Sequence, residues 1–252
     1  MARTQLATRL AVLATCLLWA KPTPSQTFAI GSTGSGQAPL TRRESVILGS
    51  WSAWLALAPS ACAGTKVDLT LPVTKERIPE VKKALLQLAD ETGRGTTATP
   101  EQKRSMDSFA LALASAEPSR PASPDMLSGT WNLVYTTEKE VLSLIGDPGV
   151  SVYQKLDSSA GTLGNSIVFT DGKRFDVSGT VSSGKQPEAA ADGYPAGLRS
   201  SFRFVGAALT VNPSITVPLP PFGAGWFVSV YLDENLRVNR DSRGDLAIYF
   251  RA

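Results

Sequence analysis

The stretch Gly129-Thr130-Trp131-Asn132-Leu133-Val134-Tyr135-Thr136-Thr137 predicts the first strand of the folded domain. Large apolar side chains recur at every second position, which places Trp131, Leu133 and Tyr135 on one face. A period of two is typical of a strand that buries one face, because successive side chains point to opposite sides. Gly129 leaves room for another segment to pass beside the large Trp131 ring. We therefore expect a β-rich domain that begins here.

The chain after this first strand predicts a series of short antiparallel strands. They are expected at residues 151–157, 165–170, 173–181, 198–205, 209–211, 215–217, 225–233, 235–240 and 245–251. Asp171-Gly172 between two of them is typical of a hairpin turn. Residues 182–197 are small, polar and rich in glycine, and predict a mobile surface loop. About seven to nine strands at this spacing predict a barrel or a sandwich.

Two helices are expected in residues 64–128, before the strands. Pro79 suits a first helical turn and Gly93 a helix end, whereas Thr99-Pro100-Glu101-Gln102 is a capping box that begins the second helix. Their narrow apolar stripes consist of Val81, Leu85 and Leu88, and of Met106, Phe109 and Leu113. Because charges of both signs accompany these stripes, we expect helices that pack on the sheet or close a barrel end, rather than helices that lie on a membrane. Residues 138–149 predict a short helix or a lid.

The charge of the chain is divided unevenly. Five of the 25 basic residues and one of the 22 acidic residues precede residue 64, so the remainder has 20 basic and 21 acidic groups and a net charge of −1. Such a balance of charges does not indicate nucleic-acid binding. The chain has no histidine, and both cysteines, Cys16 and Cys62, lie in the same early region. If this region is removed, disulfides, thiol nucleophiles, Cys/His metal sites and histidine bases are excluded.

Residues 1–63 predict a composite targeting sequence. Arg3 and Arg9 precede the apolar residues 10–20, which are typical of a secretory signal peptide. Residues 21–40 lack acids and are rich in Ser, Thr, Gly and Pro, as in a transit peptide, and Phe28 suits the start of one. This order resembles the import sequence of algae with complex plastids.

A third signal is expected within the same region. Arg42-Arg43, the apolar residues 46–58 and Ala61-Cys62-Ala63 together resemble a twin-arginine export signal, which predicts the thylakoid lumen and a mature N-terminus near Gly64. The alternative is that the two arginines belong to the transit peptide and that residues 46–58 anchor the chain in a membrane. A stroma-facing thylakoid or plastoglobule location then applies.

Two groups of motifs carry a family resemblance. The first is Leu127-Ser128-Gly129-Thr130-Trp131 with Leu133-Val134-Tyr135-Thr136-Thr137. The second group consists of Pro218-Leu219-Pro220-Pro221, Gly225-Trp226-Phe227, Tyr231-Leu232-Asp233-Glu234, Leu236-Arg237-Val238 with Arg240, and Arg243-Gly244-Asp245. In this order they resemble the opening and closing signatures of the plastid lipid-associated protein family, also called plastid fibrillins. The resemblance covers about residues 74–251 of the chain.

The resemblance implies a lipocalin-like antiparallel β-barrel with N-terminal helices, in which residues 64–128 form the helical part and residues 129–252 the barrel. It also implies a non-enzymatic protein, without a cofactor, that binds quinones, carotenoids or lipids at a thylakoid membrane or plastoglobule surface. The twin-arginine signal departs from the usual stroma-facing members and favours a lumenal carrier over plastoglobule coating.

Aromatic residues in the expected strands are candidates for a ligand cavity. They are Trp131, Tyr135, Phe169, Phe175, Phe202, Phe204, Trp226 and Tyr231. A barrel of about eight strands is wide enough for one small apolar ligand, although the same side chains can instead fill a solid core.

Two arginines and an apolar segment complete the candidates. Arg237 and Arg240 are three positions apart and therefore face opposite sides of a strand. We expect Arg237 to stack on Trp131 at one barrel end and Arg240 to face solvent or Asp233. Pro218-Leu219-Pro220-Pro221-Phe222 predicts either a rim that enters a lipid surface or a rigid loop.

The sequence offers little for catalysis. Asp233-Glu234 is an adjacent acidic pair, whose side chains point apart in a strand, and Asp241 and Asp245 flank a turn. No phosphate loop, dinucleotide fingerprint or nucleophile elbow occurs. A lipid- or isoprenoid-modifying enzyme, or an accessory subunit of one, is the alternative function, and a structural protein with a filled barrel is a third.

Overall fold

The computed structural model describes residues 67–70, 73–116, 123–190, 193–220 and 223–252, without the side chains of residues 185–187. The expected targeting sequence in residues 1–63 lies outside these ranges. In the described ranges no helix combines the length and the apolar character needed to cross a membrane.

The helices lie where the sequence predicts them. They are η1 (Lys75–Arg77), α3 (Ile78–Glu91), η2 (Gly93–Gly95), α4 (Pro100–Ala116), η3 (Pro124–Leu127) and α5 (Lys139–Leu142). The capping box at the start of α4 is confirmed by two reciprocal hydrogen bonds: the Gln102 amide donates to Thr99 Oγ1 at 3.2 Å, and the Thr99 amide donates to Gln102 Oε1 at 2.9 Å. Both bonds satisfy donors that the first helical turn otherwise leaves free.

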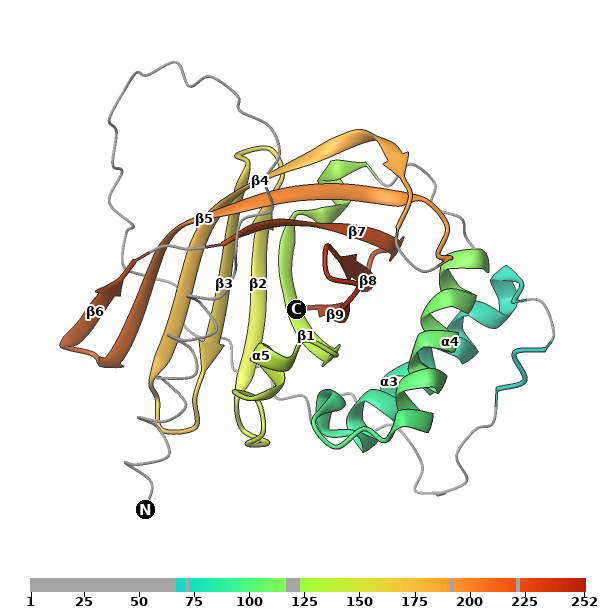
Figure 1. Cartoon of the computed structure of the whole chain (residues 1–252), viewed down its shortest axis with the longest axis horizontal. Helices are drawn as coiled ribbons and strands as arrows, with labels where there is room; N and C mark the ends of the chain where they lie inside the picture. Colours follow the sequence, from blue (N-terminus) through green and yellow to red (C-terminus); the bar gives the residue numbers. More distant parts are fainter. Residues whose placement is uncertain (1–66, 71–72, 117–122, 191–192, 221–222) are drawn as a thin grey trace. The chain divides into compact units, whose positions relative to one another are not determined.

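Eight strands close into an antiparallel barrel, as the family resemblance implies (Figure 1). The strands are β1 (Gly129–Thr136), β2 (Ser151–Asp157), β3 (Thr162–Val168), β4 (Arg174–Glu188), β5 (Gly197–Asn212), β6 (Ile215–Leu219), β7 (Ala224–Leu232), β8 (Leu236–Asp241) and β9 (Leu246–Arg251). The order β4-β3-β2-β1-β9-β8-β7-β5 returns to β4 through a β4–β5 pairing. β6 is the ninth strand and pairs with β5 alone.

Two strands are longer than the sequence indicates. β4 continues to Glu188, so the predicted surface loop at residues 182–197 is wrong over its first half. Likewise the separate strands predicted at 198–205 and 209–211 form the single strand β5. Ser182 pairs with Ser201 and Ser183 with Ser200, and these backbone hydrogen bonds to a long partner strand override the weak strand preference of Ser and Gly.

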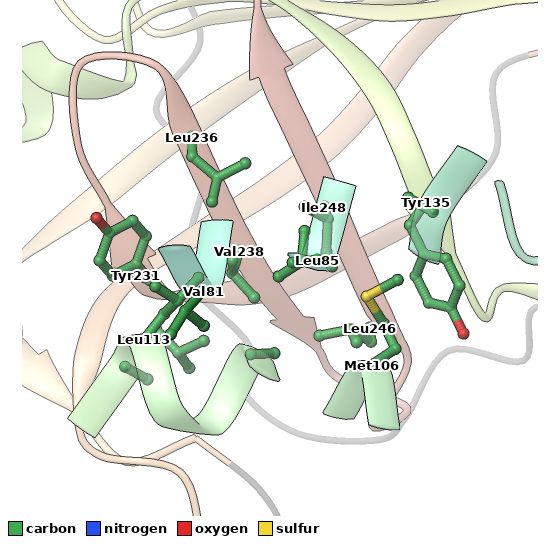
Figure 2. Close-up of a cluster of buried hydrophobic side chains, with 14 of the residues drawn as sticks. Val81, Leu85, Met106, Leu113, Tyr135, Tyr231, Leu236, Val238, Leu246 and Ile248 are labelled. Atoms are coloured by element: carbon green, nitrogen blue, oxygen red, sulfur yellow. The ribbon is translucent and has the colours of Figure 1, made fainter. Parts of the chain in front are cut away.

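Helices α3 and α4 cover the outer face of the strands β1, β7, β8 and β9 (Figures 1 and 2). Figure 2 shows Val81 and Leu85 of α3 and Met106 and Leu113 of α4 against Val238, Leu246 and Ile248 of β8 and β9. This is the packing role that their narrow apolar stripes predict.

The barrel interior holds two other apolar clusters. The first lies toward α5 and contains Leu144, Ile145, Ile167, Phe169, Phe175 and Ala247. The second lies toward η3 and contains Leu127, Trp131, Leu156, Leu163, Val181 and Leu198. Tyr249 packs against both of them, so it lies between the two halves of the interior.

Candidate functional site

Arg237, the second residue of β8, points into the barrel. Its neighbours Leu236 and Val238 pack under the helices, so the alternation of the strand turns Arg237 inward. The side chain is 0% exposed. Burial of a guanidinium is unusual for a side chain that carries a charge at every physiological pH, which makes this position the natural centre of a candidate site.

Three aromatic rings surround the Arg237 guanidinium. Its Cζ atom lies 4.9 Å from the centroid of Trp131, 4.4 Å from that of Tyr249 and 5.6 Å from that of Phe227. The contact with Trp131 is the one that the sequence predicts. Such cation–π contacts strengthen when water is excluded, and they hold the cation inside an otherwise apolar barrel.

Polar contact to Arg237 comes from one side. Nη2 donates a 2.6 Å hydrogen bond to Gln154 Oε1, and Gln154 Nε2 donates in turn to Asn165 Oδ1 at 2.9 Å. Among the described residues, no atom accepts a hydrogen bond from Nε or Nη1. Burial lowers the pKa of Arg237 to about 10; Tyr249 opposes this shift, and the positive charge of Arg251 adds to it with a smaller effect.

Arg251 contacts the same indole ring and has three carbonyl partners. Its Cζ atom lies 4.1 Å from the centroid of Trp131, and its guanidinium donates to the carbonyls of Met126, Ser128 and Glu234. A Cβ at Gly129 would collide with Arg251 Nη1, so Gly129 does leave room beside Trp131, as expected, and Arg251 fills it. Arg251 was not among the residues predicted from the sequence, although it lies two positions after Tyr249 in β9 and so faces the same side of the strand.

The structure separates the candidate aromatic residues into two sets. Trp131, Phe169, Phe175, Phe202 and Phe204 belong to the interior clusters.

Tyr135, Trp226 and Tyr231 lie outside the barrel wall, in the cluster under α3 and α4. The prediction that Tyr135 shares a face with Trp131 and Leu133 is therefore wrong. A register shift in β1 between Leu133 and Tyr135 is the cause, and β7 has a similar shift between Ser229 and Tyr231. Each bulge adds one residue and turns the next side chain outward.

Arg240 also departs from its expected position. It faces the outer side, as the spacing from Arg237 predicts, but it is largely buried and does not pair with Asp233. Its Nη1 atom lies 3.4 Å from Asp107 Oδ1 of α4, and its Cζ atom lies 4.9 Å from the Tyr194 centroid. Asp233 instead accepts hydrogen bonds from Lys82 and from Tyr231, both at 2.5 Å, which ties α3 to the end of β7.

The segment that contains α5 covers one end of the barrel. Leu144 and Ile145 are buried in the interior cluster at that end. Arg94, at a left-handed φ of 61° between two glycines, donates from Nη1 to the Val150 carbonyl at 2.7 Å and from Nη2 to that of Ile145 at 3.2 Å. The Gly93-Arg94-Gly95 turn therefore also anchors this covering segment, a role that the sequence did not reveal.

An ionic cluster fastens the same segment to the β8–β9 turn. Arg243 contacts Glu140 at 2.9 Å, Glu138 at 3.2 Å, Asp241 at 3.4 Å and Asp245 at 3.5 Å. Burial, and next the charge of Asp241, raise the pKa of Glu138 to about 7, although Arg243 opposes the shift. In the described ranges no group of acidic residues has the arrangement of a metal site.

The β5–β6 hairpin exposes apolar side chains beyond the barrel. Val205, Ile215 and Val217 are 55%, 51% and 42% exposed. No charged residue occurs between positions 204 and 232. Pro218-Leu219-Pro220 lies at the end of this hairpin, and the remainder of the predicted rim, Pro221-Phe222, lies outside the described residues.

Comparison with known proteins agrees with the resemblance carried by the two motif groups. The PAP_fibrillin family model matches residues 79–249. The chain is 32% identical over 215 residues to the probable plastid-lipid-associated protein 11, chloroplastic, of Arabidopsis thaliana, which covers 79% of this chain and 95% of the relative. It is 29% identical over 68 residues to the probable plastid-lipid-associated protein 5, chloroplastic, of the same plant, or 27% of this chain and 29% of the relative. No solved structure gives a significant match. The chain therefore belongs to the plastid lipid-associated protein family, the plastid fibrillins.

Proposed function

We propose that this protein is a non-enzymatic binder of a hydrophobic small molecule or lipid, which it holds inside the barrel. The observation that carries the proposal is a closed barrel whose interior has two apolar clusters that meet at Tyr249, next to a buried arginine with unused hydrogen-bond donors. An apolar lining with a few convergent polar groups is the usual composition of a ligand site.

The proposed lining residues are those that face the interior. They are Trp131, Phe169, Phe175, Phe202, Phe204 and Arg237. Tyr135, Trp226 and Tyr231 are not included, because their rings pack beneath the helices. Quinones, carotenoids and lipids remain the candidate ligand classes at this stage.

The site of action that we propose is the plastid, at the thylakoid membrane or the plastoglobule. Its support is the chloroplastic designation of both relatives and the composition of residues 1–63. The twin-arginine pattern favours the thylakoid lumen. Sequencing the N-terminus of the protein isolated from plastids tests this point: a start near Gly64 is expected, and a start near residue 29 would contradict it.

Native mass spectrometry of the purified chain after exposure to a thylakoid lipid extract tests the binding function. One apolar molecule retained at a one-to-one ratio is the expected result, and its mass identifies the ligand. If no molecule is retained, the interior is a filled core and the proposal is wrong. A retained molecule whose mass changes with time would indicate turnover and would contradict the non-enzymatic assignment.

A further inference from the structure

The charge of Arg237 has no counter-ion inside the barrel. No carboxylate of the described residues forms an ion pair with it, and the guanidinium that shares the Trp131 ring with it, Arg251, is another cation. A buried charge without a partner is costly, since the interior cannot replace the water that the guanidinium loses on folding.

Most of the hydrogen-bonding capacity of Arg237 is also unused. A guanidinium has five N–H donors in a planar fork. Gln154 takes one of them through Nη2, while Nε and Nη1 donate to no atom of the described residues. The missing partner is therefore an acceptor. A carboxylate fits, because its two oxygens can accept from neighbouring N–H groups of the guanidinium, one on Nε or Nη1 and one being the second N–H of Nη2.

The surroundings define the remainder of such a ligand. Trp131 and Tyr249 pack on the guanidinium, and both belong to the interior apolar clusters. A molecule whose oxygens reach Arg237 therefore places the rest of its body against hydrocarbon and aromatic side chains. Asn165 holds Gln154 by a hydrogen bond, which fixes the polar side of the site before a ligand arrives.

We propose that Arg237 is the head-group site of the barrel and that it binds the carboxylate of an amphiphile with an apolar tail, such as a long-chain fatty acid. This inference rests on the proposed function, because it assumes that the interior admits a ligand. It goes further in excluding pure hydrocarbons as preferred ligands, since they leave both the charge and the free donors of Arg237 without a partner. A neutral carbonyl satisfies the donors but leaves the charge uncompensated.

Three probes with the same tail test the inference on the purified full-length chain. They are palmitate, methyl palmitate and hexadecane, each titrated in competition with a fluorescent apolar probe. We expect palmitate to bind at least about tenfold tighter than methyl palmitate, because one charge-assisted hydrogen bond contributes a binding free energy of that size. Hexadecane should bind weakest of the three. Comparable affinities for all three would overturn the head-group assignment while leaving the proposed function intact. Failure of every probe to bind would overturn both.

Variants locate the selectivity on Arg237. Arg237→Met is expected to abolish the preference for palmitate but to retain hexadecane binding, and Arg237→Lys is expected to retain a reduced preference. Arg251→Met is the matched control, because it removes the other guanidinium on the same indole ring, one that already has carbonyl partners. Equal loss of selectivity in Arg251→Met would contradict the assignment. Since the palmitate preference is measured on the unmodified chain, the test stands even if Arg237→Met fails to fold.

Discussion

Leu133 and Tyr135 are two positions apart in one strand, yet they face opposite sides of the barrel wall. Leu133 packs in the interior with Ala247 and Phe175, whereas Tyr135 packs outside with the helices. The register shift between them pairs Leu133 with Tyr249 and Tyr135 with Ile248. One extra residue in β1 therefore removes the Tyr135 ring from the interior and gives it to the helical layer, where it forms part of the packing surface of α3 and α4.

Tyr135→Phe should leave ligand binding unchanged and raise the melting temperature slightly. The Tyr135 hydroxyl is buried and has no hydrogen-bond partner among the described residues, and its burial raises the pKa of the phenol to about 12. Removal of an unsatisfied buried hydroxyl raises the free energy of unfolding by about 1 kcal/mol. Thermal unfolding measures the stability, and a fall of several degrees would show that the hydroxyl has a partner.

Gly95→Ala should destabilise the protein strongly. Gly95 has a φ of 100°, and an added Cβ would collide with the backbone carbonyl oxygen of Thr136. Strain and collision together cost about 2–4 kcal/mol of unfolding free energy, measured by denaturant titration. Gly172→Ala is the matched control, because Gly172 has a φ of 80° but no atom within 4 Å of the new Cβ. If both variants lost the same free energy of unfolding, the close approach of Gly95 to β1 would be unimportant.

Stability should depend on pH through Glu138. Its pKa of about 7 in the folded state exceeds its ordinary value of 4.5, so the folded state binds more protons between these two pH values. The carboxylate therefore opposes folding fully above pH 7, and this opposition is relieved as the pH falls toward 4.5. Glu138 is 24% exposed and contacts Arg243, so we expect its ionisation to lower the free energy of unfolding by roughly 1–2 kcal/mol.

Glu138→Gln should remove this part of the pH dependence of the unfolding free energy, measured by denaturant titration at pH 8 and pH 5. Glu140→Gln removes another carboxylate from Arg243 and controls for the loss of an ion-pair partner. If the difference between wild type and Glu138→Gln were the same at both pH values, the assigned pKa would be wrong.

The exposed β5–β6 hairpin should contribute to binding at a lipid surface. Ile215→Asp with Val217→Asp places two charges on an otherwise uncharged segment and should weaken sedimentation with galactolipid vesicles at least about tenfold. Thr210→Asp with Thr216→Asp adds the same charge to a pair of threonines that already face each other across the hairpin. If both double variants lost vesicle binding equally, the added charge alone would explain the loss, and the apolar side chains would not be needed.

Much of the fold follows from local sequence signals, and the exceptions have identifiable causes. The Thr99 capping box and the alternation of side chains in β8 were predictable from the sequence, because neighbours along the chain determine them. The outward turn of Tyr135 and Tyr231 was not, since a bulge depends on the register of the partner strand. The inward stacking of Arg237 on Trp131 could be predicted, whereas its free donors and the anchoring role of Arg94 depend on contacts between distant segments.

If the ligand lies inside the barrel, a variant that fills the interior should displace it. Ala207→Phe adds a ring beside the interior cluster that contains Phe175, while Val205→Phe adds the same ring at a position that is 55% exposed. Overpacking costs about 1–3 kcal/mol, so both variants are first compared by thermal unfolding. Retention of thylakoid lipid is then measured by native mass spectrometry. The bound molecule should be lost from folded Ala207→Phe and retained by Val205→Phe; retention in both would place the ligand outside the barrel.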